Sequence, residues 1–230
     1  MKIPLSVYDF FGYLASGFIL LLSVNIAFSQ DWLFKSDQNL VMGLSLIFVA
    51  YIIGHAVAHL SWAILEEWFV RKVLHSPEET LFIDEYQSRW KRIFPCFYKP
   101  LPSETQKIVF EKTKKANISS PGQGLFFHCH PIVMRDSAAR ERLSSFLNLY
   151  GFSRNLVLAG FLSSLILLIG SFRDIWSKPR VFHPDTLGWS LVSIVIAVVM
   201  FYRYLKFFRL YTIEVFRTYA VIDDEKGRAT

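Results

Sequence analysis

Residues 41–65 read VMGLSLIFVAYIIGHAVAHLSWAIL and lie in a stretch without Asp, Glu, Lys or Arg between Asp37 and Glu66. A helix of about 20 apolar residues crosses the hydrocarbon core of a bilayer. A helix on the surface of a soluble domain needs a polar face instead. The stretch is therefore predicted to form a transmembrane helix over residues 40–65.

Three further segments have the same character. The predicted spans are residues 10–30, residues 155–172 and residues 186–202. The last two are short, but flanking Arg side chains can snorkel to the membrane interface. A cleaved signal peptide over residues 1–29 is the alternative for the first run. Its apolar stretch is longer than a typical signal core and follows Asp9, so a span is the preferred interpretation.

The composition fits this assignment. Hydrophobic residues make up 53% of the 230 residues, aromatic residues 17% and charged residues only 19%. Soluble domains contain about 25% charged residues, and here the deficit is concentrated in the spans. This excludes an ordinary soluble enzyme and a disordered protein, and two cysteines are too few for a disulfide framework. The predicted fold is an all-α polytopic membrane protein with about four transmembrane helices and a helical cytoplasmic insertion.

Lys and Arg residues near the span ends predict the orientation. With both termini in the cytoplasm, the inner residues are Lys2, Arg71, Lys72, Arg135, Arg140, Arg142, Arg154, Arg203, Lys206, Arg209 and Arg217. The outer residues are then only Lys35, Arg173, Lys178 and Arg180. This excess predicts a multi-pass protein of the bacterial inner membrane with cytoplasmic N and C termini. The predicted parts are a transmembrane hairpin (1–67), a cytoplasmic insertion (68–154), a second hairpin with a helical extension (155–222) and a disordered tail (223–230).

The insertion is predicted to be helical at both ends. Residues 66–74 continue the second span, and residues 135–150 form an amphipathic helix that runs into the third span. Ser103 and Gln106 fit a capping box that opens a short helix as far as residue 116. Three prolines break any helix between residues 86 and 102.

Histidines in the second span are candidates for chemistry. His55 and His59 are four residues apart and share a helix face, with Glu66 near that face at the membrane boundary. Ionisable groups in a bilayer cost a few kcal/mol and are functional candidates for that reason. The preferred interpretation is hydrogen bonding of both imidazoles to Ser, Asn or Tyr across the bundle. A pore-lining or proton-sensing face and a metal site are the alternatives.

A second histidine pair lies in the insertion. His128 and His130 share a face if the segment FFHCHP is extended, with Cys129 on the opposite side. Six histidines are nevertheless too few for the several His boxes of membrane hydroxylases and desaturases. The sequence also contains no Walker A loop, GxGxxG, GxSxG or CxxC motif. No catalytic residue, cofactor or metal is therefore assigned.

Basic and aromatic residues alternate between residues 86 and 99. The candidate contact residues are Arg89, Trp90, Lys91, Arg92 and Lys99. Such a stretch can lie on anionic headgroups with Trp and Tyr at the interface. Stacking on nucleobases and neutralisation of phosphates is the second interpretation, and a role in a folded core is the third.

Two surface features complete the set of candidates. Arg203, Lys206 and Arg209 are spaced by three residues after the last span and predict a cationic stripe at the cytoplasmic surface. Small residues in the spans offer surfaces for close helix packing in a homo-oligomer. They are Gly12, Ala15, Ser16, Gly17, Gly160, Ser163 and Ser164.

Taken whole, the layout resembles a family of small bacterial membrane proteins. The segments that carry the resemblance are YDFFGYLASGFILLL (8–22), YIIGHAVAHLSWAILEEWFVRKVL (51–74), RDSAARERLSSFLNLYGFSRNL (135–156) and RYLKFFRLYTIEVFRTYAVI (203–222). They look similar to transmembrane effectors of anti-phage systems, above all the retron-associated transmembrane proteins. The membrane accessory proteins of RNA-targeting CRISPR systems are the less similar group.

The resemblance implies abortive infection, in which the effector permeabilises or depolarises the inner membrane when phage is sensed. It also implies a cytoplasmic partner, either a reverse transcriptase with its RNA–DNA product or a CRISPR effector. The function expected is thus a non-enzymatic membrane effector. A membrane-embedded enzyme or small transporter that uses the face of His55 and His59 is the alternative. Four spans with few intramembrane charges argue against a transporter.

Overall fold

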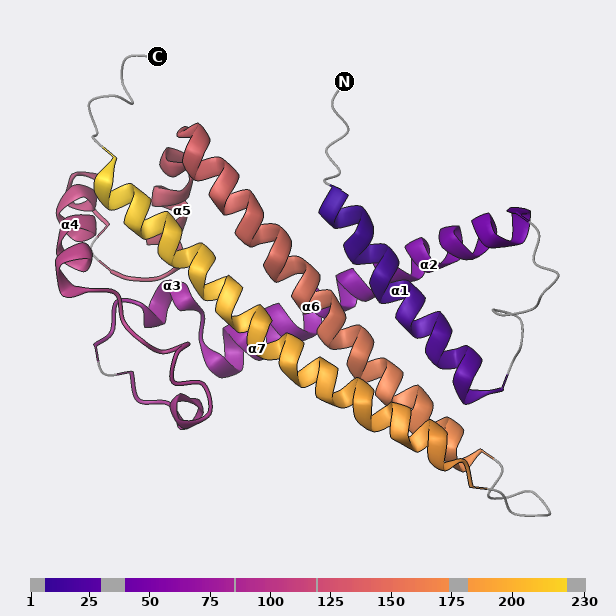
Figure 1. The fold of residues 1–230 in the computed structure, drawn as a ribbon. Coiled ribbons are helices and arrows are strands. Elements are labelled where there is room, and N and C mark those ends of the chain that lie inside the picture. The colour runs from indigo at the N-terminus through magenta and orange to yellow at the C-terminus, as the bar shows by residue number, and fades with distance from the viewer. Residues whose placement is uncertain (1–6, 30–39, 85, 119, 174–181, 223–230) are drawn as a thin grey trace. The chain divides into compact units, whose positions relative to one another are not determined.

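The computed structural model describes residues 7–29, 40–84, 86–118, 120–173 and 182–222. Within these residues every regular element is a helix, which confirms the predicted all-α fold. Four helices are long and apolar enough to cross a membrane, as expected for a polytopic membrane protein (Figure 1). The predicted tail at 223–230 lies outside the described residues.

The long helices coincide with the predicted spans. They are α1 (Val7–Ala27), α2 (Leu40–Ser61), α6 (Ser137–Phe172) and α7 (Pro184–Val221). The helix of α2 continues without a break as the wider π-helical segment η1 (Trp62–Leu74). The predicted continuation of the second span and the predicted helices before the third span and after the fourth are therefore confirmed.

The remaining elements are short and lie in the insertion. They are α3 (Pro77–Thr80), α4 (Ser103–Thr113), α5 (Gln123–Val133) and the 3-10 turns η2 (Arg89–Arg92) and η3 (Lys114–Ala116). Apart from η2, the described part of the proline-containing stretch 86–102 has no helix, as predicted. The chain divides into two compact units. Unit 1 comprises Met1–Leu65 and Gly151–Tyr204, and unit 2 comprises Glu66–Tyr150 and Leu205–Thr230.

In unit 1, glycine allows α1 and α2 to approach closely. A Cβ atom on Gly54 would lie 1.8 Å from the backbone oxygen of Tyr13, and one on Gly17 would lie 1.8 Å from that of Ala50. Only residues without a side chain permit this distance between backbones. A hydrogen bond from the Ser61 hydroxyl to Asn155 Oδ1 (2.8 Å) links α2 to α6. Unit 1 is thus held by backbone proximity, by a few buried polar contacts and by a small apolar cluster around Val57, Leu158 and Ala159.

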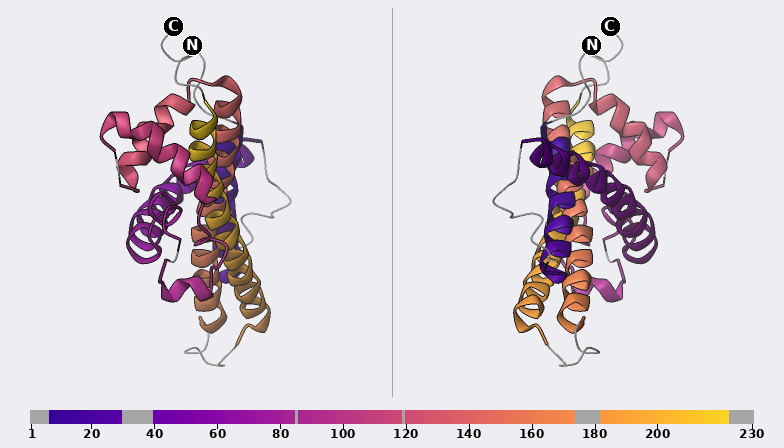
Figure 2. Two further views of the ribbon diagram at one scale, coloured as in Figure 1. Left: turned by 90° about the vertical axis from the view of Figure 1, so that its left-hand side faces the viewer. Right: turned by 90° about the vertical axis from the view of Figure 1, so that its right-hand side faces the viewer.

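Unit 2 has an aromatic and aliphatic core. Its buried residues are Leu81, Phe82, Leu101, Val109, Leu125, Phe126, Cys129, Val133, Ala139, Leu143, Val215, Phe216 and Tyr219. The last three come from α7, so the insertion does not complete its core from its own residues. Within unit 2, Arg142 Nε of α6 donates a hydrogen bond to Glu214 Oε1 of α7 (2.7 Å). Figures 1 and 2 show α6 and α7 side by side.

One local prediction is wrong, and the condition attached to another is not met. Helix α4 starts at Ser103, but its N-cap is Pro102 and no side chain caps it. The Gln106 amide donates instead to the carbonyl of Leu101 (2.9 Å), so the capping box is not formed. The segment FFHCHP is not extended, because it lies in α5, where Leu125, Cys129 and Val133 recur every four residues and face the core.

Candidate functional site

The imidazoles of His55 and His59 are exposed on α2. His55 stacks on the Tyr13 ring at 4.1 Å and meets the edge of Tyr51 at 4.6 Å, and His59 lies 5.9 Å from Trp62. Among the described residues, neither imidazole makes a hydrogen bond across the bundle, so that interpretation is wrong. The physical reason is that small residues occupy the buried face of α2: Ala50, Gly54, Val57, Ala58 and Ser61.

Glu66 does not share this exposure. Its carboxylate is buried in unit 2, accepts a hydrogen bond from the Tyr150 hydroxyl (3.2 Å) and lies 3.6 Å from Arg71 Nη2. Arg71 also lies 3.4 Å from Glu67. A buried carboxylate needs such partners, and the arrangement ties η1 to α6. In the described part of the chain no group of three His, Cys, Asp or Glu side chains could hold a metal ion.

The basic-aromatic stretch forms a loop, residues 86–100, that is fastened to unit 2 at three points. The Tyr98 hydroxyl donates to the backbone oxygen of Leu74 at the end of η1 (2.8 Å). Trp90 lies 5.9 Å from Phe69 of η1, ring to ring. Arg209 of α7 donates to the backbone oxygen of Lys99 (2.7 Å). The loop is therefore fixed to two long helices.

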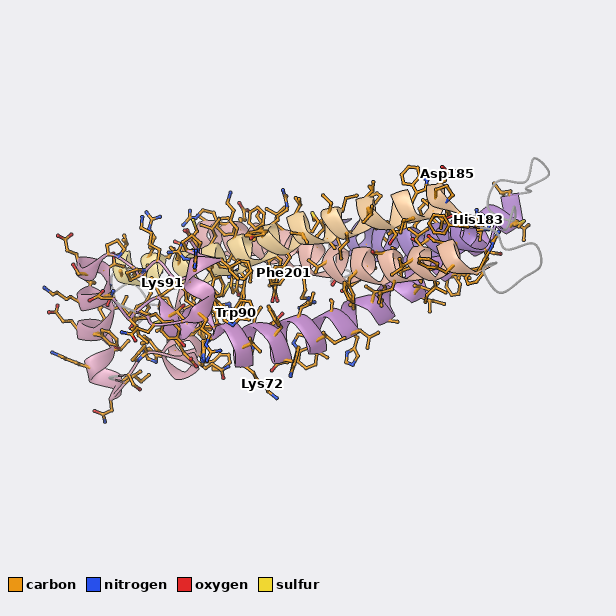
Figure 3. The ribbon with its side chains drawn as sticks, turned by 90° about the horizontal axis from the view of Figure 1, so that it is seen from below. Lys72, Trp90, Lys91, His183, Asp185 and Phe201 are labelled. Atoms are coloured by element: carbon orange, nitrogen blue, oxygen red, sulfur yellow. The ribbon has the colours of Figure 1, made fainter. Side chains whose placement is uncertain are left out.

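Aromatic and cationic side chains point in different directions in this loop. Phe94, Phe97 and Tyr98 are buried, whereas Arg89, Lys91, Arg92 and Lys99 are exposed. Burial raises the pKa of the Tyr98 phenol, although its hydrogen bond from Ser88 acts in the opposite direction. The phenol stays a neutral donor at physiological pH as a result. Trp90 is half-buried beside the helical segment that carries Lys72 (Figure 3).

The three residues of the predicted cationic stripe differ in their exposure. Arg203 and Lys206 are exposed, as a solvated stripe requires. Arg209 is half-buried and is bound to the Lys99 carbonyl. Its sequence spacing gave no signal for this second role, because its partner is 110 residues away.

The sequence did not predict the contacts of two residues of α5, the half-buried His130 and the buried Cys129. His130 Nε2 lies 2.9 Å from the Tyr211 hydroxyl, and its ring stacks on Phe126. Burial lowers the pKa of His130. Cys129 is fully enclosed by the core, which raises the pKa of its thiol to about 12. The helical period of α5 was the signal that could have separated His128 from His130.

Comparisons with protein-family models, curated proteins and solved structures found no match to this chain. Its function must therefore be inferred from its own residues.

Proposed function

We propose that the protein is a non-enzymatic effector of the bacterial inner membrane that acts in defence against phage. In the resting cell a cytoplasmic partner binds unit 2, and its release or activation on infection changes the packing of the spans and depolarises the membrane. The orientation with both termini in the cytoplasm and residues 68–154 on that side belongs to the same proposal. A reporter fused after Thr230 that is active only in the periplasm would contradict it.

One observation carries this proposal: three helices run from unit 1 into unit 2 without a break. They are α2 with η1, α6 with 36 residues and α7 with 38 residues. At about 1.5 Å per residue, α6 and α7 are more than 50 Å long, well beyond the roughly 30 Å of a hydrocarbon core. Their far ends help to build the core of unit 2.

This continuity allows a soluble partner to act on the spans. A ligand shifts a conformational equilibrium when its affinity for the two states differs. A partner that binds unit 2 more tightly in one arrangement of α6 and α7 would therefore bias the apolar parts of the same helices. A reverse transcriptase with its RNA–DNA product is the first partner proposed, and a CRISPR effector is the second.

The small residues of the spans support contacts within the chain. The Ser164 hydroxyl lies 3.1 Å from that of Ser190, and a Cβ atom on Gly160 would lie 3.1 Å from the Cβ of Ala197. Gly17 is used against α2 in the same way. A homo-oligomer would therefore have to use other surfaces, such as the exposed apolar residues of α7. His55 stacks on Tyr13, and His59 lies beside Trp62 in a tilted arrangement; neither contact supports the enzyme or the transporter.

The decisive experiment separates unit 2 from the spans without removing either. Two glycines inserted between Tyr204 and Leu205 interrupt α7 where it leaves unit 1, because glycine is unfavourable in a helix interior. The control carries the same insertion after Ile222, beyond the end of α7. We expect phage-triggered loss of membrane potential in the control and the native protein, but not in the α7 insertion variant. The proposal fails if the intact system protects cells without depolarisation and the chain alone, at high expression, leaves the potential unchanged.

A further inference from the structure

The loop 86–100 carries an uncompensated positive charge. No Asp or Glu occurs between Tyr86 and Pro102, whereas Arg89, Lys91 and Arg92 follow one another on η2 and are exposed. Within the described residues none of these three forms an ion pair. An apolar side chain, Ile93, lies next to them and is 50% exposed. The surface thus combines cations with one exposed apolar group.

The loop is attached to η1 and α7 at positions that lie shortly after the predicted span ends in the sequence. Trp90 contacts Phe69, four residues after the predicted end of the second span at Leu65. Lys99 is bound by Arg209, seven residues after the predicted end of the fourth span. Seven residues of α-helix correspond to about 10 Å. Along the helices the attachment points are thus within about 10 Å of the predicted span ends, which is about one Debye length.

The basic residues of α4 belong to a part of unit 2 that contacts α7 farther from the predicted span end. Lys112 donates to the backbone oxygen of Tyr219 (3.2 Å), which places α4 beside a part of α7 ten residues farther along than Arg209. That is about 15 Å more, and charges separated by more than a Debye length of about 10 Å are largely screened. Lys107 and Lys114, which precede and follow Lys112 in the chain, are exposed. They provide a matched pair of charges for comparison with the loop.

We infer that Arg89, Lys91, Arg92 and Ile93 form a binding surface for anionic lipid headgroups that holds unit 2 against the membrane. The cations match the phosphates in charge, and Ile93 can enter the interface between them. Single-stranded nucleic acid is the weaker match, because it requires aromatic faces for base stacking and Phe94, Phe97 and Tyr98 are buried. The inference requires that the helices cross a bilayer, but it does not require the defence role.

The two cysteines make the test selective. Cys96 is exposed within the loop, whereas Cys129 is buried and its pKa of about 12 leaves almost no reactive thiolate at pH 7. A maleimide fluorophore therefore reports on the loop. The labelled full-length protein is placed in nanodiscs of phosphatidylcholine with or without phosphatidylglycerol, and quenching by a headgroup spin-labelled lipid is measured.

We expect quenching to increase with phosphatidylglycerol and to fall again in 0.5 M salt. Each near-surface charge increases the equilibrium constant for binding to anionic lipid about fivefold. The variant K91Q/R92Q removes two such charges, so it should lower the ratio of docked to undocked loop about 30-fold. The control K107Q/K114Q should change it less than twofold. Continued protection of Cys129 from labelling shows that each variant is folded.

Three results would overturn the inference. The first is quenching of the native protein that does not depend on phosphatidylglycerol or on salt. This measurement requires no variant. The α4 control could lose as much quenching as K91Q/R92Q. The fluorophore could respond to a single-stranded RNA oligonucleotide in phosphatidylcholine discs and not to phosphatidylglycerol, which would assign the surface to nucleic acid.

Discussion

Helix α7 exposes most of its apolar residues in unit 1 and buries or half-buries most of them in unit 2, although Ala197 is buried in unit 1 and Val221 is exposed at the end of the helix. Val195 is 61% exposed and belongs to unit 1, whereas Val215 and Phe216, farther along the same helix, are 0% exposed in unit 2. The contrast is weaker along α2 and η1: Phe48 of α2 is 65% exposed, and Val70 and Leu74 of η1 are fully buried, but Val57 of α2 is buried and Trp68 of η1 is exposed. The side chains thus indicate a change of solvent along continuous helices.

The two units accordingly depend on different forces. In lipid, burial of an apolar side chain brings little gain, and helices associate through close packing and polar contacts. That description fits the glycine contacts of α1 and α2. In water, burial of apolar area dominates, at about 25 cal/mol per Å², and unit 2 has the aromatic core that this requires. Substitutions that attack one force should therefore damage one unit.

The largest effect is expected in the core of unit 2. Phe216 is fully buried and contacts Phe82 and Phe126 with ring centroids at 4.8 and 6.1 Å. Phe216→Ala should lower the free energy of unfolding by about 3–5 kcal/mol, because it removes buried area and leaves a cavity. Phe127→Ala, at a residue that is 65% exposed, is the control and should cost little. Chemical unfolding of the purified protein in detergent measures both, and equal losses would contradict the assignment of this core.

In unit 1 the matching test is a substitution that enlarges a side chain at a close helix contact. Gly54→Val places a side chain where the Tyr13 backbone oxygen would be 1.8 Å from Cβ. Helices α1 and α2 must then separate, at the upper end of the usual cost of overpacking, about 3 kcal/mol. The control Gly43→Val lies on the same helix with no heavy atom within 4 Å of the new Cβ. Similar thermal stability of the two variants in detergent would show that the close approach does not stabilise unit 1.

The sequence predicts the elements of both units better than their contacts. The spans follow from local composition, so the positions of α2, α6 and α7 could be predicted. The contact of Gly54 with Tyr13 could not, because it depends on how two helices cross. In the candidate site, the exposed cations of the loop could be named in advance.

The hydrogen bonds that attach the loop 86–100 to the helices could not be predicted from the sequence. Tyr98 binds a backbone oxygen 24 residues away, and Arg209 binds one 110 residues away. Backbone acceptors carry no sequence signature, so periodicity and spacing cannot identify such partners. Helical spacing also does not predict how a ring meets its neighbour: His55 was expected to form hydrogen bonds across the bundle, whereas its ring stacks on Tyr13.

A smaller effect on stability is expected at the ion pair between α6 and α7 in unit 2. Arg142 and Glu214 pair at 2.7 Å, but the Arg142 side chain is half exposed. Exposed pairs contribute up to about 1 kcal/mol and are weakened by salt. A double-mutant cycle with Arg142→Ala and Glu214→Ala should therefore give a coupling energy of roughly 0.5–1 kcal/mol in low salt, and less in 0.5 M NaCl. The exchanged pair R142E/E214R should recover part of the loss, and an unchanged coupling energy in high salt would argue against an ionic contribution.

The smallest effect is a dependence of the stability of unit 2 on pH. Burial lowers the pKa of His130 below the ordinary value of 6.5. The unfolded chain therefore binds a proton at a higher pH than the folded chain, and stability is lost as the pH falls below about 6.5 and through the folded pKa. The neutral ring keeps its contact with the Tyr211 hydroxyl at 2.9 Å above this range.

Between pH 7 and pH 5, His130→Gln should remove the loss of stability that protonation of His130 causes. His128→Gln, two residues away on α5, should retain this loss. The comparison requires the difference between the free energies of unfolding at the two pH values for each variant, because glutamine also changes packing against Phe126 and that contribution cancels in the difference. Unfolding of the full chain in detergent, followed by tryptophan fluorescence, gives these differences. If both variants keep the native pH dependence, other groups cause it, and the half-buried contact of His130 with Tyr211 has no titrating role.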